Sequence, residues 1–199
     1  MTAPSVRRRG RPGHDRDSVL AAAVAVFNER GYDGTSMEDL SARLGIGKSS
    51  IYHHVESKQA LLGLALDRAL LGLEQAAQLV REQEGPAVDR LNTLLRASIA
   101  VLVQQLPYVT LLLRVRGNSE VERSALTRRR RIDTLVAQLV REAIDEGALR
   151  SDVDPALVAR LLFGTVNSLT DWLKPTTRYS PAELADTLGA MVFAGLLPR

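Results

Sequence analysis

The amino-acid sequence predicts an all-α protein, in which an N-terminal three-helix domain with a helix-turn-helix precedes a larger helical domain. Composition is the first reason, because 45% of the residues are hydrophobic, only 4% are aromatic, and Leu and Ala dominate; such a mixture favours helices. Periodicity is the second, since apolar residues recur at helical spacing along about nine segments and no segment alternates like a strand. The third is that cap residues and glycines delimit these segments.

The first helix is expected over residues 15–30. Within it Leu20, Val24 and Phe27 recur at a spacing that places them on one face. Gly31 follows directly, and glycine is the residue that most readily adopts the left-handed conformation at the end of a helix. The helix therefore has one buried face and a defined end.

The second and third helices are short. Either Thr35 or Ser36 can cap a helix over residues 37–44, because acidic residues follow at the spacing of a capping box. Residues 45–47, Gly-Ile-Gly, then turn the chain, and a short helix is expected from Lys48. Together these segments predict a helix-turn-helix.

Six further helices are expected, over residues 57–84, 86–106, 108–116, 119–146, 155–173 and 181–196. Pro107 is expected to separate the fifth helix from the sixth, because proline breaks a helix, and Gly147 to end the seventh. Asp154-Pro155 and Ser180-Pro181 each combine an N-cap residue with a proline in the first helical position. This combination marks the starts of the last two helices.

The chain is expected to have three parts, since its length allows one small and one larger domain. Residues 1–14 contain proline and glycine but no apolar periodicity, and are expected to be a flexible basic arm. The helix-turn-helix domain is expected over residues 15–56, and the larger helical domain over residues 57–199.

The basic arm concentrates positive charge in a chain whose net charge is only +3. Its arginines, with one that follows, are Arg7, Arg8, Arg9, Arg11 and Arg16. Such a run attracts a phosphate backbone without regard to sequence. Alternatively Arg8, Arg9 and Arg11, with Gly and Pro keeping the chain thin, fit a hook into an A·T-rich minor groove. The two interpretations are equally compatible with the sequence.

Several classes of protein are disfavoured by composition and spacing. The chain has no cysteine, which excludes disulfides and thiolate metal sites. No apolar run approaches the roughly 20 residues that cross a bilayer, and the first residues lack the apolar segment of a signal peptide, so a cytoplasmic protein is expected.

The sequence also lacks the residue patterns of common catalytic, phosphate-binding and metal sites. No nucleophile with a base, no paired acids, no phosphate-binding glycine loop and no metal-ligand spacing is present. The adjacent His53 and His54 point about 100° apart on a helix and cannot easily share a metal. We therefore expect a protein that is not an enzyme and needs no cofactor or metal.

The third helix presents a polar surface. Ile51 is expected to pack inward, which leaves outward-facing donors at Lys48, Ser49, Ser50, Tyr52 and His53. In a DNA-binding helix-turn-helix the second helix of the motif lies in the major groove with its first residues at base edges. The same geometry also occurs in helical hairpins that only pack, so DNA binding is favoured but not the sole interpretation.

Residues 35–61, TSMEDLSARLGIGKSSIYHHVESKQAL, closely resemble the DNA-binding signature of the Tet-repressor family. The shared features are the opening Thr35, Leu40 and Ala42 in the packed core, Gly45-Ile46 in the turn, Ile51-Tyr52, and Ser57-Lys58. The resemblance extends over about residues 15–65. Two positions depart from it, because Gly47 replaces a capping serine and Val55 replaces an aromatic residue.

The resemblance implies particular DNA contacts. Positions that contact operator phosphates in the family are Thr35, Lys48, Tyr52, His53 and Lys58, and positions near base edges are Ser49, Ser50 and His53. It also implies a repressor that binds a pseudopalindromic operator in double-stranded DNA as a homodimer and is released by a small-molecule effector. An effector-blind activator or architectural dimer, or a helical adaptor without DNA binding, are the alternatives.

The family places its dimer interface on the last two helices, here 155–173 and 181–196, whose wide apolar faces could otherwise serve core packing. Candidate effector-binding residues are polar groups in apolar surroundings: Arg114, Arg116, Asn118, Asn167, Thr170, Asp171 and Trp172. Asn167 is the foremost of these, although a buried asparagine bonded to backbone is an equal interpretation. The run at 128–131 is either a solvated face or a cationic mouth for a coenzyme A thioester.

Overall fold

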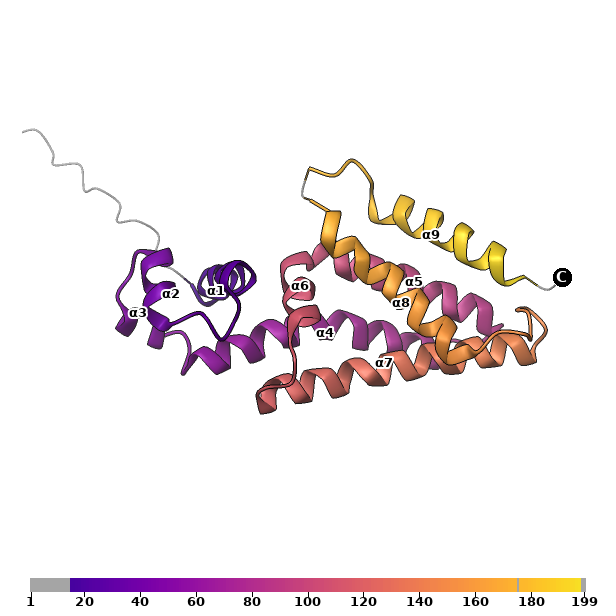
Figure 1. The fold of residues 1–199 in the computed structure, drawn as a ribbon, viewed down its shortest axis with the longest axis horizontal. Helices are drawn as coiled ribbons and strands as arrows, with labels where there is room; N and C mark the ends of the chain where they lie inside the picture. Colours follow the sequence, from indigo (N-terminus) through magenta and orange to yellow (C-terminus); the bar gives the residue numbers. More distant parts are fainter. Residues whose placement is uncertain (1–14, 175, 198–199) are drawn as a thin grey trace, which may run out of the picture. The chain divides into compact units, whose positions relative to one another are not determined.

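The computed structural model describes residues 15–174 and 176–197. Over these residues the chain forms nine helices and no strand, as the sequence predicts. It divides into two compact units, Met1–Leu61 and Leu62–Arg199. The division falls within one helix, α4 (Lys58–Glu82), which begins in the first unit and continues into the second (Figure 1).

The first unit consists of α1 (Arg16–Arg30), α2 (Met37–Leu44), α3 (Lys48–Tyr52) and the start of α4. Asp15 caps α1 by accepting a hydrogen bond from the Ser18 backbone N–H at 2.8 Å. Gly31 ends α1 with a φ of 82°, a conformation that glycine adopts without strain. Phe27, Leu40 and Ile51 are fully buried, one from each helix, and form the centre of this unit.

The second unit contains the rest of α4 and five further helices. These are α5 (Ala87–Gln104), α6 (Leu106–Arg114), α7 (Glu120–Asp145), α8 (Pro155–Trp172) and α9 (Pro181–Leu196). Helix α5 packs against α7 and α9, and α7 packs against α8 (Figure 1). The shared core is apolar and closely filled, since the void among Leu94, Val136 and Phe193 holds only about 10 Å³.

The break between α5 and α6 lies two residues before the proline that was expected to cause it. Helix α5 ends at Gln104, Gln105 has φ −116° and ψ 29°, and Pro107 lies in the first turn of α6. A proline in the first turn costs little, because that turn's N–H groups have no partner within the helix. The same ring would clash with α5 if that helix continued, so the chain bends by 101° before the proline.

Helix α4 approaches α5 closely at Gly72. A Cβ atom placed on Gly72 would lie 2.8 Å from Cγ2 of Val101, closer than real Cβ atoms come to other atoms. A short distance before it, Arg68 bonds Gln105 at 3.2 Å and lies over the ring of Tyr108 at 4.8 Å. Glycine at position 72 is therefore a packing requirement.

Helix α5 contributes buried apolar residues to the core of the second unit. Among the described residues, no single helix is both long and apolar enough to cross a membrane, and only the bent pair of α5 and α6 reaches that length and composition together. Leu91, Leu94 and Ile99 on α5 are buried against neighbouring helices.

Candidate nucleic-acid interface and ligand grooves

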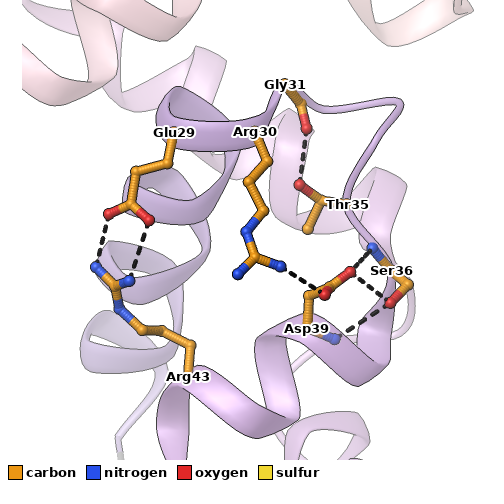
Figure 2. Close-up of polar contacts among 7 residues, drawn as sticks. All are labelled: Glu29, Arg30, Gly31, Thr35, Ser36, Asp39 and Arg43. Atoms are coloured by element: carbon orange, nitrogen blue, oxygen red, sulfur yellow. Dashed lines mark hydrogen bonds and ion pairs between the residues drawn. The ribbon is translucent and has the colours of Figure 1, made fainter.

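Helix α2 begins with the capping box that the sequence predicts, and Ser36 is the cap. The Ser36 hydroxyl accepts from the Asp39 N–H at 3.2 Å, and the Asp39 carboxylate accepts from the Ser36 N–H at 2.8 Å (Figure 2). The Ser36 hydroxyl also donates to the Asp39 carboxylate at 2.7 Å. This bond first, and then the bond from the Ser36 N–H, lowers the pKa of Asp39 below its ordinary value. Gly45 then closes α2 with a φ of 66° and turns the chain towards α3.

Two ion pairs hold α2 against α1. Arg30 bonds Asp39 at 2.7 Å, and Arg43 makes two bonds to Glu29, at 2.7 and 3.1 Å (Figure 2). The hydrogen bond from Arg43 lowers the pKa of Glu29. Exposed pairs such as these add little stability, but paired contacts fix an orientation. The sequence reasoning missed them, because each joins two helices and has no spacing signature within one.

Helix α3 presents the polar surface that was expected of it. Lys48, Ser49 and His53 are exposed, Ser50 is half-buried, and the Tyr52 ring is 50% exposed. Lys48 forms an ion pair with Glu38 of α2. Ile51 points inward and is fully buried. Most hydrogen-bonding side chains of α3 therefore lie at the surface, as expected of a helix that contacts bases in a major groove.

The beginning of α3 is weakly held. Gly47 is its N-cap and provides no side-chain hydrogen bond. A cap serine would bond a backbone N–H of the first turn, and glycine costs a few tenths of a kcal/mol relative to it. The replacement of the usual capping serine by Gly47, noted in the sequence, therefore leaves the first turn of α3 without a side-chain cap.

Thr35 and Lys58 lie differently from the phosphate contacts that the resemblance implies. Thr35 is only 2% exposed, and its hydroxyl donates to the carbonyl of Gly31 at 2.7 Å (Figure 2). The Lys58 ammonium donates to the carbonyls of Tyr32 and Thr35, at 2.9 and 2.8 Å, and lies 4.3 Å from the centre of the Tyr32 ring. Both side chains donate hydrogen bonds to backbone carbonyls at the turn between α1 and α2. Their DNA contacts stay predictions.

One expectation about the core of this unit was wrong. Ala42 is exposed, although Leu40 is fully buried. Residues two positions apart on a helix point about 200° away from each other, so Leu40 and Ala42 cannot both face the same core. The arm residues Arg8, Arg9 and Arg11 lie outside the described residues, and their contacts stay predictions.

Two adjoining grooves open on the face formed by α6, α7 and α8 in the second unit. Their volumes are about 430 and 530 Å³, within the range of small-molecule sites. Arg129, Gly164 and Asn167 line both grooves. The first is also lined by Asp133, Arg160 and Phe163, and the second by Arg114, Thr170 and Asp171.

The expected effector residues divide into two sets. Arg114, Asn167, Thr170 and Asp171 line the grooves, and Asn167 is half-buried between them rather than in the core. Trp172 is exposed at the end of α8 and lines neither groove.

Arg116 and Asn118 belong to a different arrangement, in the loop between α6 and α7. Their backbone N–H groups, with that of Gly117, donate to one oxygen of Glu122 at 3.1, 2.9 and 2.7 Å. Glu122 is only 3% exposed. The loop is therefore folded around a buried carboxylate, which the sequence did not reveal because the donors are main-chain groups.

The arginines of the run at 128–131 lie in different surroundings, and a role in effector binding stays a prediction. Arg128 pairs with Glu74 through two bonds of 2.7 Å and also with Asp67, which ties α7 to α4. Its hydrogen bond lowers the pKa of Glu74. Arg129 lines both grooves, whereas Arg130 and Arg131 are exposed.

Asp133 is a groove residue that sequence reasoning missed. Partial desolvation raises the pKa of its carboxyl, while the positive charges of Arg129 and Arg160 act in the opposite direction. The i, i+4 spacing from Arg129 was a signal that these two side chains share one face of α7.

Helices α8 and α9 leave apolar side chains uncovered. Leu157, Leu161 and Trp172 on α8 are exposed, as is Met191 on α9. On α8 these residues recur at intervals of four and eleven, which places them along one stripe.

No group of three possible ligands that could hold a metal occurs within the described residues.

Comparison with protein families gives matches to both parts of the chain. Residues 19–65 match the model described as bacterial regulatory proteins, tetR family, and residues 84–196 match the model of the tetracyclin repressor-like C-terminal domain.

Individual relatives agree with these matches. A structure of SCO3833, a member of the TetR transcriptional regulator family from Streptomyces coelicolor A3, is 48% identical, with 89% of this chain and 90% of that chain covered and a TM-score of 0.81. The HTH-type transcriptional repressor DhaR of Mycobacterium sp. strain GP1 is 28% identical over 92% of each protein. AibR, solved in complex with isovaleryl coenzyme A and operator DNA, is 26% identical, covering 89% of this chain and 97% of its own, with a TM-score of 0.75.

Proposed function

The chain belongs to the tetR family of bacterial transcriptional regulators, and on this premise we propose that it is a repressor that binds a pseudopalindromic operator as a homodimer and is released by a small-molecule effector. The observation that carries the proposal is the exposed polar face of α3. The buried Ile51 anchors α3 in the core, and a capping box and ion pairs to α1 fix the preceding helix, α2. A helix presented in this way can enter a major groove.

The DNA-contacting residues are proposed in two groups. On α3, Ser49, Ser50 and His53 approach base edges, while Lys48, Tyr52 and His53 contact phosphates. Thr35 and Lys58 support the turn that orients α2 and α3, and we retain them as phosphate contacts implied by the family resemblance. Arg8, Arg9 and Arg11 add sequence-independent affinity or groove insertion.

The dimer is proposed to form through α8 and α9. The exposed stripe of Leu157, Leu161 and Trp172, with Met191 on α9, is an apolar surface that association with a second copy would bury. A two-fold dimer presents two identical DNA-binding domains, so the operator that it binds is expected to contain two related half-sites.

The effector is proposed to bind within residues 57–199, which follow in the sequence a proposed arm at 1–14 and a proposed DNA-binding domain at 15–56. The relative AibR is seen with an acyl coenzyme A and operator DNA. Arginines at the grooves of this chain, Arg129 and Arg160 among them, suit the phosphates of such a ligand. We therefore propose a coenzyme A thioester as the class of effector.

Selection of tightly bound fragments from random duplex DNA by the purified protein tests the proposal. Recovery of a pseudopalindrome, bound with an affinity that falls steeply as salt rises, is expected. Sequence-specific binding that no acyl coenzyme A relieves would favour an effector-blind activator or architectural dimer. Absence of any enriched sequence would remove the operator-binding function.

A further inference from the structure

Lys48, the first residue of α3 and a proposed phosphate contact, already has an anionic partner within the protein. Its ammonium group forms an ion pair with the carboxylate of Glu38, which lies in the first turn of α2. Helices α2 and α3 pack against each other, so the pair joins two neighbouring elements of the first unit. A cation that is expected to bind DNA therefore lies beside a carboxylate of its own chain.

Glu38 differs in this respect from two other paired acids of the first unit. Glu29 binds Arg43 and Asp39 binds Arg30, and both pairs hold α2 against α1 (Figure 2). Neither arginine is among the proposed DNA contacts. The partner of Glu38, in contrast, belongs to the face of α3 that is proposed to meet DNA, so DNA binding would disturb this pair directly.

The ion pair is exposed, so a DNA phosphate can reach it. The side chains of Lys48 and Glu38 are 47% and 62% exposed. An exposed ion pair contributes little to stability, and a lysine ammonium on its flexible stem changes partners without movement of the backbone. Gly47, which precedes Lys48, adds no side-chain bond at the start of α3. Exchange of the Glu38 carboxylate for a phosphate therefore requires no unfolding.

The exchange opposes DNA binding in two ways. The complex gains a contact between Lys48 and a phosphate, but the protein loses the pair between Lys48 and Glu38. The freed carboxylate also stays near the phosphate that replaces it, because one ammonium group reaches both. Their separation is comparable with the Debye length of about 10 Å at 0.1 M salt, so the two negative charges repel.

We propose that Glu38 is an internal counter-ion of Lys48, which competes with DNA phosphate for the ammonium group and so limits the affinity of the protein for duplex DNA. The inference rests on the proposed function, because it requires Lys48 to contact a phosphate. The competition involves the DNA backbone, so it acts on every sequence. Glu38 is thus an affinity-determining residue, which also weakens binding to the many genomic sites that contain no operator.

Fluorescence anisotropy of the full chain with a labelled duplex of random sequence tests the proposal without knowledge of the operator. Glu38→Gln is expected to bind about two- to fivefold more tightly than the natural protein at about 0.1 M salt, which corresponds to the strength of an exposed ion pair. This gain should shrink as the salt concentration rises, because salt screens the charge of Glu38. The selected operator should show a gain of similar size.

Two controls show whether Glu38 acts through Lys48. Glu29→Gln removes the same charge and also breaks an exposed ion pair between helices, but it frees Arg43, which is not a proposed DNA contact. Its affinity should change much less than that of Glu38→Gln. In a Lys48→Gln background Glu38 has no ammonium group to hold, so the gain from Glu38→Gln should fall by at least about half on a logarithmic scale.

Three results would overturn the inference: unchanged or weaker binding by Glu38→Gln, an equal gain in Glu29→Gln, or an undiminished gain in the Lys48→Gln background. Weaker binding would mean that the carboxylate itself contacts the DNA, as an acid that accepts from the amino group of cytosine does. Circular dichroism confirms that each variant is folded, and Glu38→Ala replaces Glu38→Gln if that variant unfolds.

The same measurements separate this inference from the proposed function. A natural protein that binds duplex DNA, with no gain in Glu38→Gln, keeps the DNA-binding function and loses the competition by Glu38. A natural protein and a Glu38→Gln variant that both fail to bind any duplex would overturn the two together.

Discussion

Tyr52 is the residue on which the DNA-binding face of α3 can be tested most directly. Its ring is 50% exposed and is not among the buried residues that form the core. We expect Tyr52→Ala to lower operator affinity about five- to tenfold, because one phosphate contact is lost, and to leave the oligomeric state unchanged. Fluorescence anisotropy with labelled operator measures the affinity.

The matched control for this change is Tyr179→Ala, which removes a tyrosine of similar exposure, 44%, from the loop between α8 and α9. This variant should bind operator like the natural protein. If Tyr52→Ala binds with full affinity, Tyr52 is not a DNA contact.

Glu122 gives a prediction about stability at the scale of one side chain. Its buried carboxylate accepts three backbone N–H groups. In Glu122→Gln the amide oxygen can take the place of the one carboxylate oxygen that accepts all three, but it carries no ionic charge and the bonds to it are weaker. We therefore expect a loss of about 1 to 3 kcal/mol in the free energy of unfolding. Urea denaturation measures it.

Glu120→Gln serves as the control for this substitution, because Glu120 is exposed in the first turn of the same helix. Its stability should change by less than about 0.5 kcal/mol. Equal losses in the two variants would mean that the bonds from residues 116–118 contribute nothing.

Residues whose role depends on local periodicity could be predicted from the sequence, and those with distant partners could not. The inward position of Ile51 and the capping of α2 follow from spacing alone. The bonds of Lys58 to Tyr32 and Thr35 join residues more than twenty positions apart. The acceptors are backbone carbonyls, which every residue has, so no pattern of residue types in the sequence marks such contacts.

At the scale of elements, Arg128 links α7 to α4 and makes stability depend on pH. Its bonds lower the pKa of Glu74 in the folded protein below the ordinary value of 4.5. The contribution of Glu74 is therefore present above pH 4.5 and is lost as the pH falls through the folded value. We expect Arg128→Met to lower the free energy of unfolding at pH 7 by about 0.5 to 1.5 kcal/mol.

Urea denaturation at several pH values checks this expectation. The difference between Arg128→Met and the natural protein should shrink as the pH falls below 4.5, where Glu74 gains a proton. Arg130→Met, a loss of the same charge at an exposed position, should show neither effect. A constant difference at all pH values would assign the role of Arg128 to packing rather than to the ion pair.

The helices themselves were largely predictable, because capping and periodicity are local. Ser180 and Glu183 start α9 with a capping box at the position that the sequence indicates. The end of α5 was displaced from its expected position, since a proline excludes the helix that precedes it but is tolerated in the first turn of the next. Sequence reasoning located the break near Pro107 and assigned it to the wrong residue.

For the molecule as a whole, association through α8 and α9 is the property most open to measurement. Leu161 is 62% exposed in the middle of the apolar stripe on α8. A charge at this position would have to be buried without a partner in a dimer. We expect Leu161→Glu to convert the protein to a species of 21.7 kDa, the mass of one chain, in light scattering after gel filtration.

Leu79→Glu is the control, because Leu79 is 61% exposed but lies on α4, away from the stripe. It should leave the mass unchanged. A monomer in the natural protein, or a dimer that survives Leu161→Glu, would contradict the proposed interface.

The grooves could not be read from the sequence, although some of their residues could. Arg114, Asn167 and Thr170 were identified as polar groups among apolar neighbours, but such a pattern does not say which of them meet. Arg129 was considered only as part of the run at 128–131, and Asp133 was not considered, because charges on a long polar helix usually face solvent. Their shared position depends on how α7 and α8 pack, which is a property of three dimensions.

The close approach at Gly72 limits how α4 and α5 can pack. Val101 of α5 lies against the backbone of α4 because position 72 has no side chain. Even a methyl group there would have to displace Val101 or move the two helices apart, so the spacing of α4 and α5 depends on the smallest of the amino acids.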